Sequence, residues 1–130
     1  MKIVYWCDLN DDVENEAKFI KKQLADIGIS RFNFLVHTNG PQILKDSFDI
    51  LFFDWGGMSM GNSLLEHFCD YILKHAEENP SRIYIMNSTF TAYAMRDAKE
   101  EYGDEFKEIP NVFLNFVQAT PYIKEKEREE

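Results

Sequence analysis

The sequence predicts a three-layer α/β/α sandwich, in which helices cover both faces of a five-stranded parallel sheet. Short apolar segments alternate along the chain with segments of helical periodicity. The connections between the apolar segments are of helix length, as parallel strands require. In addition, the segment Phe48–Phe53 is largely apolar, which is typical of a strand covered on both faces.

The first half of the chain predicts three strands and two helices. The first strand, Lys2–Cys7, is β-branched and aromatic, and Asp and Asn residues that can cap a helix follow it. A helical stripe then appears at Val13, Ala17, Ile20, Leu24 and Ile27. Gly28 can end this helix in the left-handed conformation. We expect a second strand at Phe32–Val36, a short helix at Pro41–Lys45 and a central strand at Phe48–Phe53.

The middle of the chain predicts two further helices around a fourth strand. The first of them begins at Asn62 or Ser63 and ends before Pro80. Its broad apolar stripe consists of Leu64, Leu65, Phe68, Ile72, Leu73 and Ala76. Arg82–Met86 is expected to be the fourth strand, and a helix over Phe90–Tyr102 follows it.

The fifth predicted strand, Val112–Val117, completes a sheet of flavodoxin-like order 2-1-3-4-5. In this order the strand sequence reverses between the first and third strands, and a ligand crevice forms there. The remaining segment IKEKEREE lacks apolar periodicity, so we expect a solvated helical turn or a frayed end. The predicted organisation is one domain over residues 1–122 and a charged tail over 123–130.

Composition limits the classes of function. The chain has 130 residues and is 45% hydrophobic, which suits a single core. No stretch approaches the roughly 20 apolar residues of a membrane helix and no secretory leader is recognised, so we expect a cytoplasmic protein without a membrane partner. The net charge of −9 disfavours nucleic acid, whose phosphates need basic residues. Cys7 and Cys69 lie in apolar segments and are expected to be buried thiols.

Parallel strands would gather acidic side chains at one edge of the sheet. Asp8, Asp11 and Asp12 follow the first strand, and Asp54 follows the neighbouring third strand. Clustered carboxylates repel one another unless a cation or raised pKa values relieve them, and Mg²⁺ typically takes one or two carboxylates plus water. A Mg²⁺ site is therefore the leading hypothesis. Asp11 and Asp12 could instead stabilise the start of the first helix, whereas Asp54 ends a buried strand and must be solvated, paired or metal-bound.

This arrangement resembles the receiver domains of response regulators. This chain and the receivers share an acidic cluster after strand one, an Asp at the end of strand three and a Ser or Thr at the end of strand four. The segment DWGGMSMG is also similar to the family's pattern of Asp, two or three residues, Met, a small residue and Gly. The resemblance implies these roles: Asp54 as phosphoacceptor, Asp8 with Asp11 or Asp12 as Mg²⁺ ligands, and Ser88 or Thr89 as switch hydroxyl.

Strand five departs from the receiver pattern. Receivers have Lys followed by Pro there, whereas this chain reads VQATPY, with Gln118 at the expected strand end and Thr120 before Pro121. The cation that contacts the phosphoryl group is therefore missing, since Lys124 lies further on in the charged tail. We predict an atypical, non-enzymatic receiver-like domain that acts in regulation or through a partner protein, and we do not expect it to be phosphorylated.

The resemblance also raises the question of a homodimer. In a receiver-like dimer the interface would involve the fourth helix and fifth strand, with Tyr93, Tyr102 and Phe113.

Ser88 and Thr89 have an ordinary alternative role, because both can cap the helix that follows the fourth strand.

A small Mg²⁺-dependent enzyme acting on a phosphate or nucleotide is the alternative function. The same carboxylates would hold the metal, and Gly56, Gly57 and Gly61 could cradle the anion at the start of the next helix. The methionines of that loop could instead form an apolar lip for a partner protein.

Other catalytic patterns are incomplete. Asp8-Leu9-Asn10 is similar to the Asp-x-Asp motif of haloacid-dehalogenase-type phosphatases but lacks its second carboxylate. The three histidines, His37, His67 and His75, do not have the spacing of metal ligands. Ser59 has no nucleophile-elbow frame around it.

Overall fold

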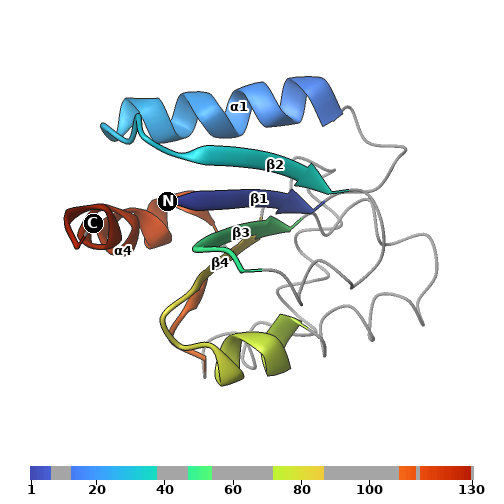
Figure 1. Ribbon diagram of the computed structural model, residues 1–130, viewed down its shortest axis with the longest axis vertical. Coiled ribbons are helices and arrows are strands. Elements are labelled where there is room, and N and C mark those ends of the chain that lie inside the picture. The colour runs from blue at the N-terminus through green and yellow to red at the C-terminus, as the bar shows by residue number, and fades with distance from the viewer. Residues whose placement is uncertain (7–12, 38–46, 54–71, 87–108, 114, 130) are drawn as a thin grey trace.

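The computed structural model describes residues 1–6, 13–37, 47–53, 72–86, 109–113 and 115–129. Within them, five parallel strands form one sheet in the order β2-β1-β3-β4-β5, which confirms the predicted order (Figure 1). The strands are β1 Lys2–Trp6, β2 Asn33–His37, β3 Ile50–Phe53, β4 Ile83–Met86 and β5 Val112–Phe113. The helices are α1 Val13–Asp26 and α4 Phe116–Arg128, and residues 72–78 are also helical. In this described part, no helix combines the length and apolarity needed to cross a membrane.

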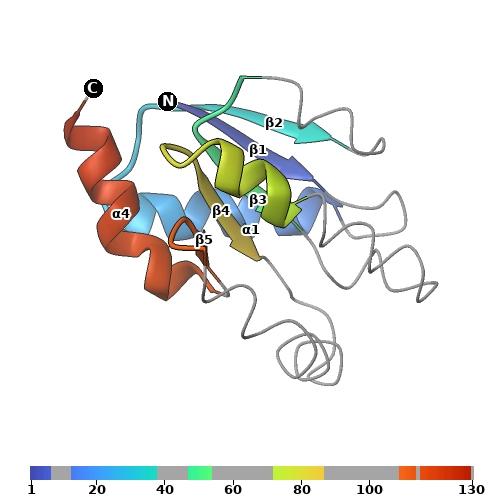
Figure 2. The ribbon, with the colours of Figure 1, turned by 90° about the horizontal axis from the view of Figure 1, so that it is seen from below.

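Helices cover both faces of the sheet, so the predicted three-layer sandwich is confirmed. Figure 2 shows α1 and the 72–78 helix on opposite sides of the strands. On one face Ile20 and Leu24 of α1 and Ile123 of α4 pack against β1, β3 and β4. On the other face Ile72 and Ala76 pack against the alternate residues of the same strands. The alternation follows from the period of two along a strand.

Helix α1 ends where the sequence predicts. Gly28 has φ +90°, a left-handed conformation that favours glycine. Its N–H donates to Ala25 O at 3.0 Å, and the N–H of Ile29 donates to Leu24 O at 2.9 Å. These two bonds are the Schellman arrangement, and the apolar contact that accompanies it comes from Leu24 and Ile29, which belong to the same core cluster.

The predicted strand Val112–Val117 is wrong beyond Phe113, because a helix begins instead. The side chain of Asn115 accepts the N–H of Gln118 at 2.9 Å and caps α4 from an extended backbone conformation. Ala119 and Ile123, four residues apart, are fully buried on one face of this helix.

The segment expected to be a charged tail therefore forms the last turns of α4. The predicted boundary between residues 122 and 123 falls inside this helix. Pro121 also lies within α4 and removes the N–H that would bond Val117 O. Val117 is 79% exposed, so water can satisfy that carbonyl. The predicted helices at 41–45 and 90–102 and the start of the helix at residues 62 or 63 lie outside the described residues.

One buried side chain joins the 72–78 helix to the sheet. Asn111, which is 8% exposed, donates through Nδ2 to the carbonyls of Ala76, Asn79 and Arg82 at 3.0, 3.1 and 3.0 Å. Its own carbonyl accepts the N–H of Tyr84 at 2.9 Å. Asn111 thus ties β5 to the helix end and to the turn before β4.

We predict that Asn111→Ala lowers the free energy of unfolding by about 2–3 kcal/mol, because it removes a buried amide that donates to three carbonyls. The carbonyls of Ala76 and Asn79 keep the backbone N–H groups of Asn79 and Arg82 as donors, so the loss is that of the side-chain bonds. Urea unfolding followed by circular dichroism measures this difference. The matched control is Asn33→Ala at an exposed position, where a change within about 0.5 kcal/mol is expected. Equal effects of the two substitutions would contradict the role of Asn111.

Candidate functional site

The last described residues of the central strands lie side by side in the sheet. Trp6 of β1 pairs with Phe53 of β3, and Phe53 pairs with Met86 of β4. On the other side Trp6 pairs with His37 of β2. The strand order reverses between β1 and β3, so this edge holds the topological switch point at which ligands bind in open α/β sheets.

The residues predicted to form the site come directly after these strand ends in the sequence, and they lie outside the described residues. They are Asp8, Asp11, Asp12, Asp54, Gly56, Gly57, Gly61, Ser88 and Thr89. Their roles stay predictions, as does the Mg²⁺ site. Among the residues that the structure describes, no group of three or more His, Cys, Asp or Glu side chains could hold a metal ion.

The sequence predicted that Gln118 and Thr120 lie at the end of strand five, and the structure shows that this prediction is wrong. Both belong to α4, where the backbone N–H of Gln118 donates to the cap residue Asn115. The hydroxyl of Thr120 donates to Phe116 O at 3.0 Å, one turn back along the helix. β5 ends at Phe113, so Gln118 is not the residue that corresponds to the strand-five lysine of receivers.

Of the residues considered for a dimer, Tyr93 and Tyr102 lie outside the described residues. Phe113 is buried at the end of β5, and its ring centroid lies 4.9 Å from that of Tyr122 in α4. Tyr122 is half exposed, so this pair brings an aromatic surface to the outside of the molecule.

A second polar cluster, which the sequence did not reveal, lies where β4 begins. Tyr84 is fully buried, and its hydroxyl is hydrogen-bonded to Nδ1 of His75. The ring of Phe48 stacks on His75 and meets Tyr84 edge-on, with centroids 5.8 Å apart in both pairs. The guanidinium of Arg82 lies 4.7 Å from the centroid of the Phe48 ring. Phe48 is far from His75 and Tyr84 in the sequence, so no local spacing of residues indicates this cluster.

Burial raises the pKa of Tyr84 to about 12, and the charge and hydrogen bond of nearby Arg82 oppose that rise. The hydroxyl is therefore neutral at physiological pH and can either donate or accept a hydrogen bond. The cluster has no exposed nucleophile, and its geometry suits a structural link between the 72–78 helix and β4. Comparisons with protein-family models, with curated protein sequences and with solved structures find no match to this chain.

The raised pKa of Tyr84 predicts a loss of stability at high pH. An unfolded tyrosine ionises near pH 10, whereas folded Tyr84 keeps its proton up to about pH 12, so the folded state binds more protons in this window. The free energy of unfolding should fall by about 2 kcal/mol between pH 10 and 12 for this residue alone. Urea unfolding of the wild type and of Tyr84→Phe across this range measures the contribution. Parallel pH profiles of the two proteins would contradict it.

Proposed function

We propose that the chain is a cytoplasmic, receiver-like regulatory module that binds a partner protein and holds Mg²⁺ with carboxylates at the carboxyl edge of its sheet. The observation that carries the proposal is the pairing of Trp6 with Phe53 at the switch point. In the sequence Asp54 follows Phe53 directly, and Asp8 follows Trp6 by two residues. Neighbouring strands are about 5 Å apart, which supports one cation shared by the two carboxylates.

The choice of a regulatory module rather than an enzyme is supported by the end of strand five. β5 ends at Phe113, and the next two residues in the sequence are Leu and Asn115 rather than lysine. The side chain of Asn115 is already engaged as the cap of α4. Without a lysine at the end of β5, carboxylates that held Mg²⁺ would lack the cation that receivers place there, which supports metal binding without an efficient transfer step.

We predict that Mg²⁺ produces a saturable change in tryptophan emission and raises the midpoint of thermal unfolding. Both tryptophans are reporters, because Trp6 is the buried last residue of β1 and Trp55 follows Asp54 directly in the sequence. The substitution Asp54→Asn should abolish both effects, since it removes one ligand charge. The matched control is Asp26→Asn. Asp26 is the last residue of α1, whereas the predicted metal ligands that follow β1 precede the first residue of that helix, so this substitution should leave both effects unchanged.

Three outcomes bear on the proposal. The absence of both effects in the wild type, or their persistence in Asp54→Asn, would contradict the metal site. A stable adduct with beryllofluoride that depends on Asp54 would show that the domain is a working receiver despite the missing lysine. Steady release of phosphate from nucleotides by the wild type, lost in Asp54→Asn, would replace the regulatory module with the small Mg²⁺-dependent enzyme.

A further inference from the structure

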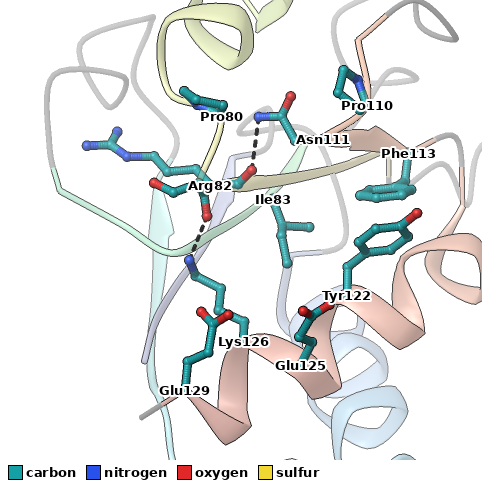
Figure 3. A pocket seen from close by; sticks show the side chains of 11 residues that line it. Pro80, Arg82, Ile83, Pro110, Asn111, Phe113, Tyr122, Glu125, Lys126 and Glu129 are labelled. Carbon is teal, nitrogen blue, oxygen red and sulfur yellow. Dashed lines mark hydrogen bonds between the residues drawn. The ribbon is translucent and has the colours of Figure 1, made fainter.

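A hollow of about 370 Å³ lies at the amino edge of the sheet, opposite the edge of the proposed Mg²⁺ site (Figure 3). The turn before β4, the start of β5 and the last turns of α4 enclose it. A second hollow of about 540 Å³ adjoins it and shares Pro80, Pro110 and Asn111 as lining residues. Together they form a groove on the outside of the described structure, which we call the amino-edge groove.

The floor of the amino-edge groove is apolar and partly aromatic. Ile83 and Phe113 line it from the sheet, and the ring of Tyr122 lies beside Phe113. Tyr122 is 52% exposed, although it belongs to a helix whose buried positions, Ala119 and Ile123, lie nearby. An open aromatic face next to prolines is the kind of surface on which an arginine guanidinium or an apolar side chain stacks.

The rim of the groove is negative. Glu125 lies in α4 and Glu129, four residues on, is the residue that caps its carboxyl end; Figure 3 shows both side chains rising towards β4. Like charges at this spacing repel each other, and a cation between them would turn the repulsion into attraction. The carboxyl end of α4 carries the negative end of the helix dipole at the same place. Glu77 adds a further carboxylate beside the adjoining hollow.

The two basic residues that line the groove are directed to other contacts. Lys126 donates from Nζ to Ser81 O at 2.6 Å, and its Nζ lies 3.9 Å from Oδ1 of Asp49. The guanidinium of Arg82 lies over the ring of Phe48, and Figure 3 shows this side chain pointing away from Phe113 and Tyr122. The Lys126 side chain rises between the two glutamates in Figure 3, but its ammonium group is directed to Ser81 O. Within the described residues neither Glu125 nor Glu129 forms an ion pair, so the groove offers an apolar floor and two carboxylates that can each accept a cation.

We propose that the amino-edge groove binds a segment of a partner protein in which arginine alternates with apolar residues. The guanidinium would pair with Glu125 and stack on Tyr122, with Glu129 adding to the negative potential, and an apolar neighbour would occupy the floor at Ile83 and Phe113. Arginine fits better than lysine, because its planar group both stacks on rings and pairs with carboxylates through two N–H groups. The net charge of −9 also attracts a basic segment to the protein.

This inference goes beyond the proposed Mg²⁺ site and does not depend on it. A direct test is a titration of the ¹⁵N-labelled full chain, in buffer with EDTA, with an acetylated and amidated peptide of alternating leucine and arginine. We expect saturable shifts of the backbone amide signals of Ile83, Asn111, Phe113 and Tyr122. A serine–arginine peptide should bind at least about fivefold more weakly, and a leucine–glutamate peptide should not bind.

Matched variants separate the groove from the general acidity of the chain. The double substitution Glu125→Gln with Glu129→Gln should raise the Kd of the leucine–arginine peptide about three- to tenfold. The control, Glu14→Gln with Asp26→Asn, changes the net charge equally at two exposed positions of α1 and should leave the Kd unchanged. Tyr122→Ala, which alters a half-exposed ring, should weaken binding by a similar factor without changing the thermal unfolding midpoint by more than a few degrees.

The proposal fails under any of three results. One is the absence of saturable shifts up to several millimolar peptide, and another is a set of shifts scattered over the acidic surface. The third is equal weakening by the groove variant and the α1 control. None of these results bears on the Mg²⁺ site, because that metal is removed by EDTA throughout.

Discussion

The structure depends on the burial of β1, β3 and β4 on both faces. Every residue of β3 and β4 is buried, and β1 is buried from Ile3 to Trp6. Because water cannot reach these backbones, their N–H and C=O groups have to pair within the sheet. A slip of one residue would move each side chain to the opposite core, so the register is strongly specified. The alignment of Trp6, Phe53 and Met86 across the three strands follows from this constraint.

The two edges of the sheet differ in how the described residues hold them. At the amino edge, side chains join elements that are far apart in the sequence. Oδ2 of Asp49 accepts the N–H of Lys2 at 2.7 Å, and Lys126 connects α4 to the turn before β4. Asn111 adds bonds to three carbonyls. These contacts anchor the strands at one end, so that the positions of their opposite ends are set by a rigid frame, as a preorganised binding site requires.

Much of the fold can be predicted from the sequence, because local patterns carry it. Apolar strands alternating with amphipathic helices predicted the sheet order, and Gly28 ended α1 as expected. The error at strand five has an equally local cause. The segment 112–117 contains two valines and two phenylalanines, which favour a strand. The cap made by Asn115 and the buried pair Ala119 and Ile123 nevertheless favour a helix.

The candidate sites could be predicted from the sequence only in part. Strand order alone predicted that the ends of β1 and β3 are neighbours, and the register confirms that part. The carboxylates themselves lie outside the described residues. The amino-edge groove and the cluster around Tyr84 could not be predicted, because both bring together segments that are far apart in the sequence, such as Phe48 with Tyr84 and Ile83 with Glu125. Such contacts leave no periodic signal in the sequence.

The most direct test of the central claim is paramagnetic broadening of backbone amide signals by Mn²⁺, which accepts the same oxygen ligands as Mg²⁺. The account predicts that substoichiometric Mn²⁺ broadens the signals of Trp6, Phe53 and Met86 at the carboxyl edge. The signals of Lys2 and Ile83, at the other end of the same strands, should remain sharp, and excess Mg²⁺ should reverse the broadening. Broadening centred on the amino edge, or spread evenly over the protein, would contradict a metal site at the carboxyl ends of β1 and β3.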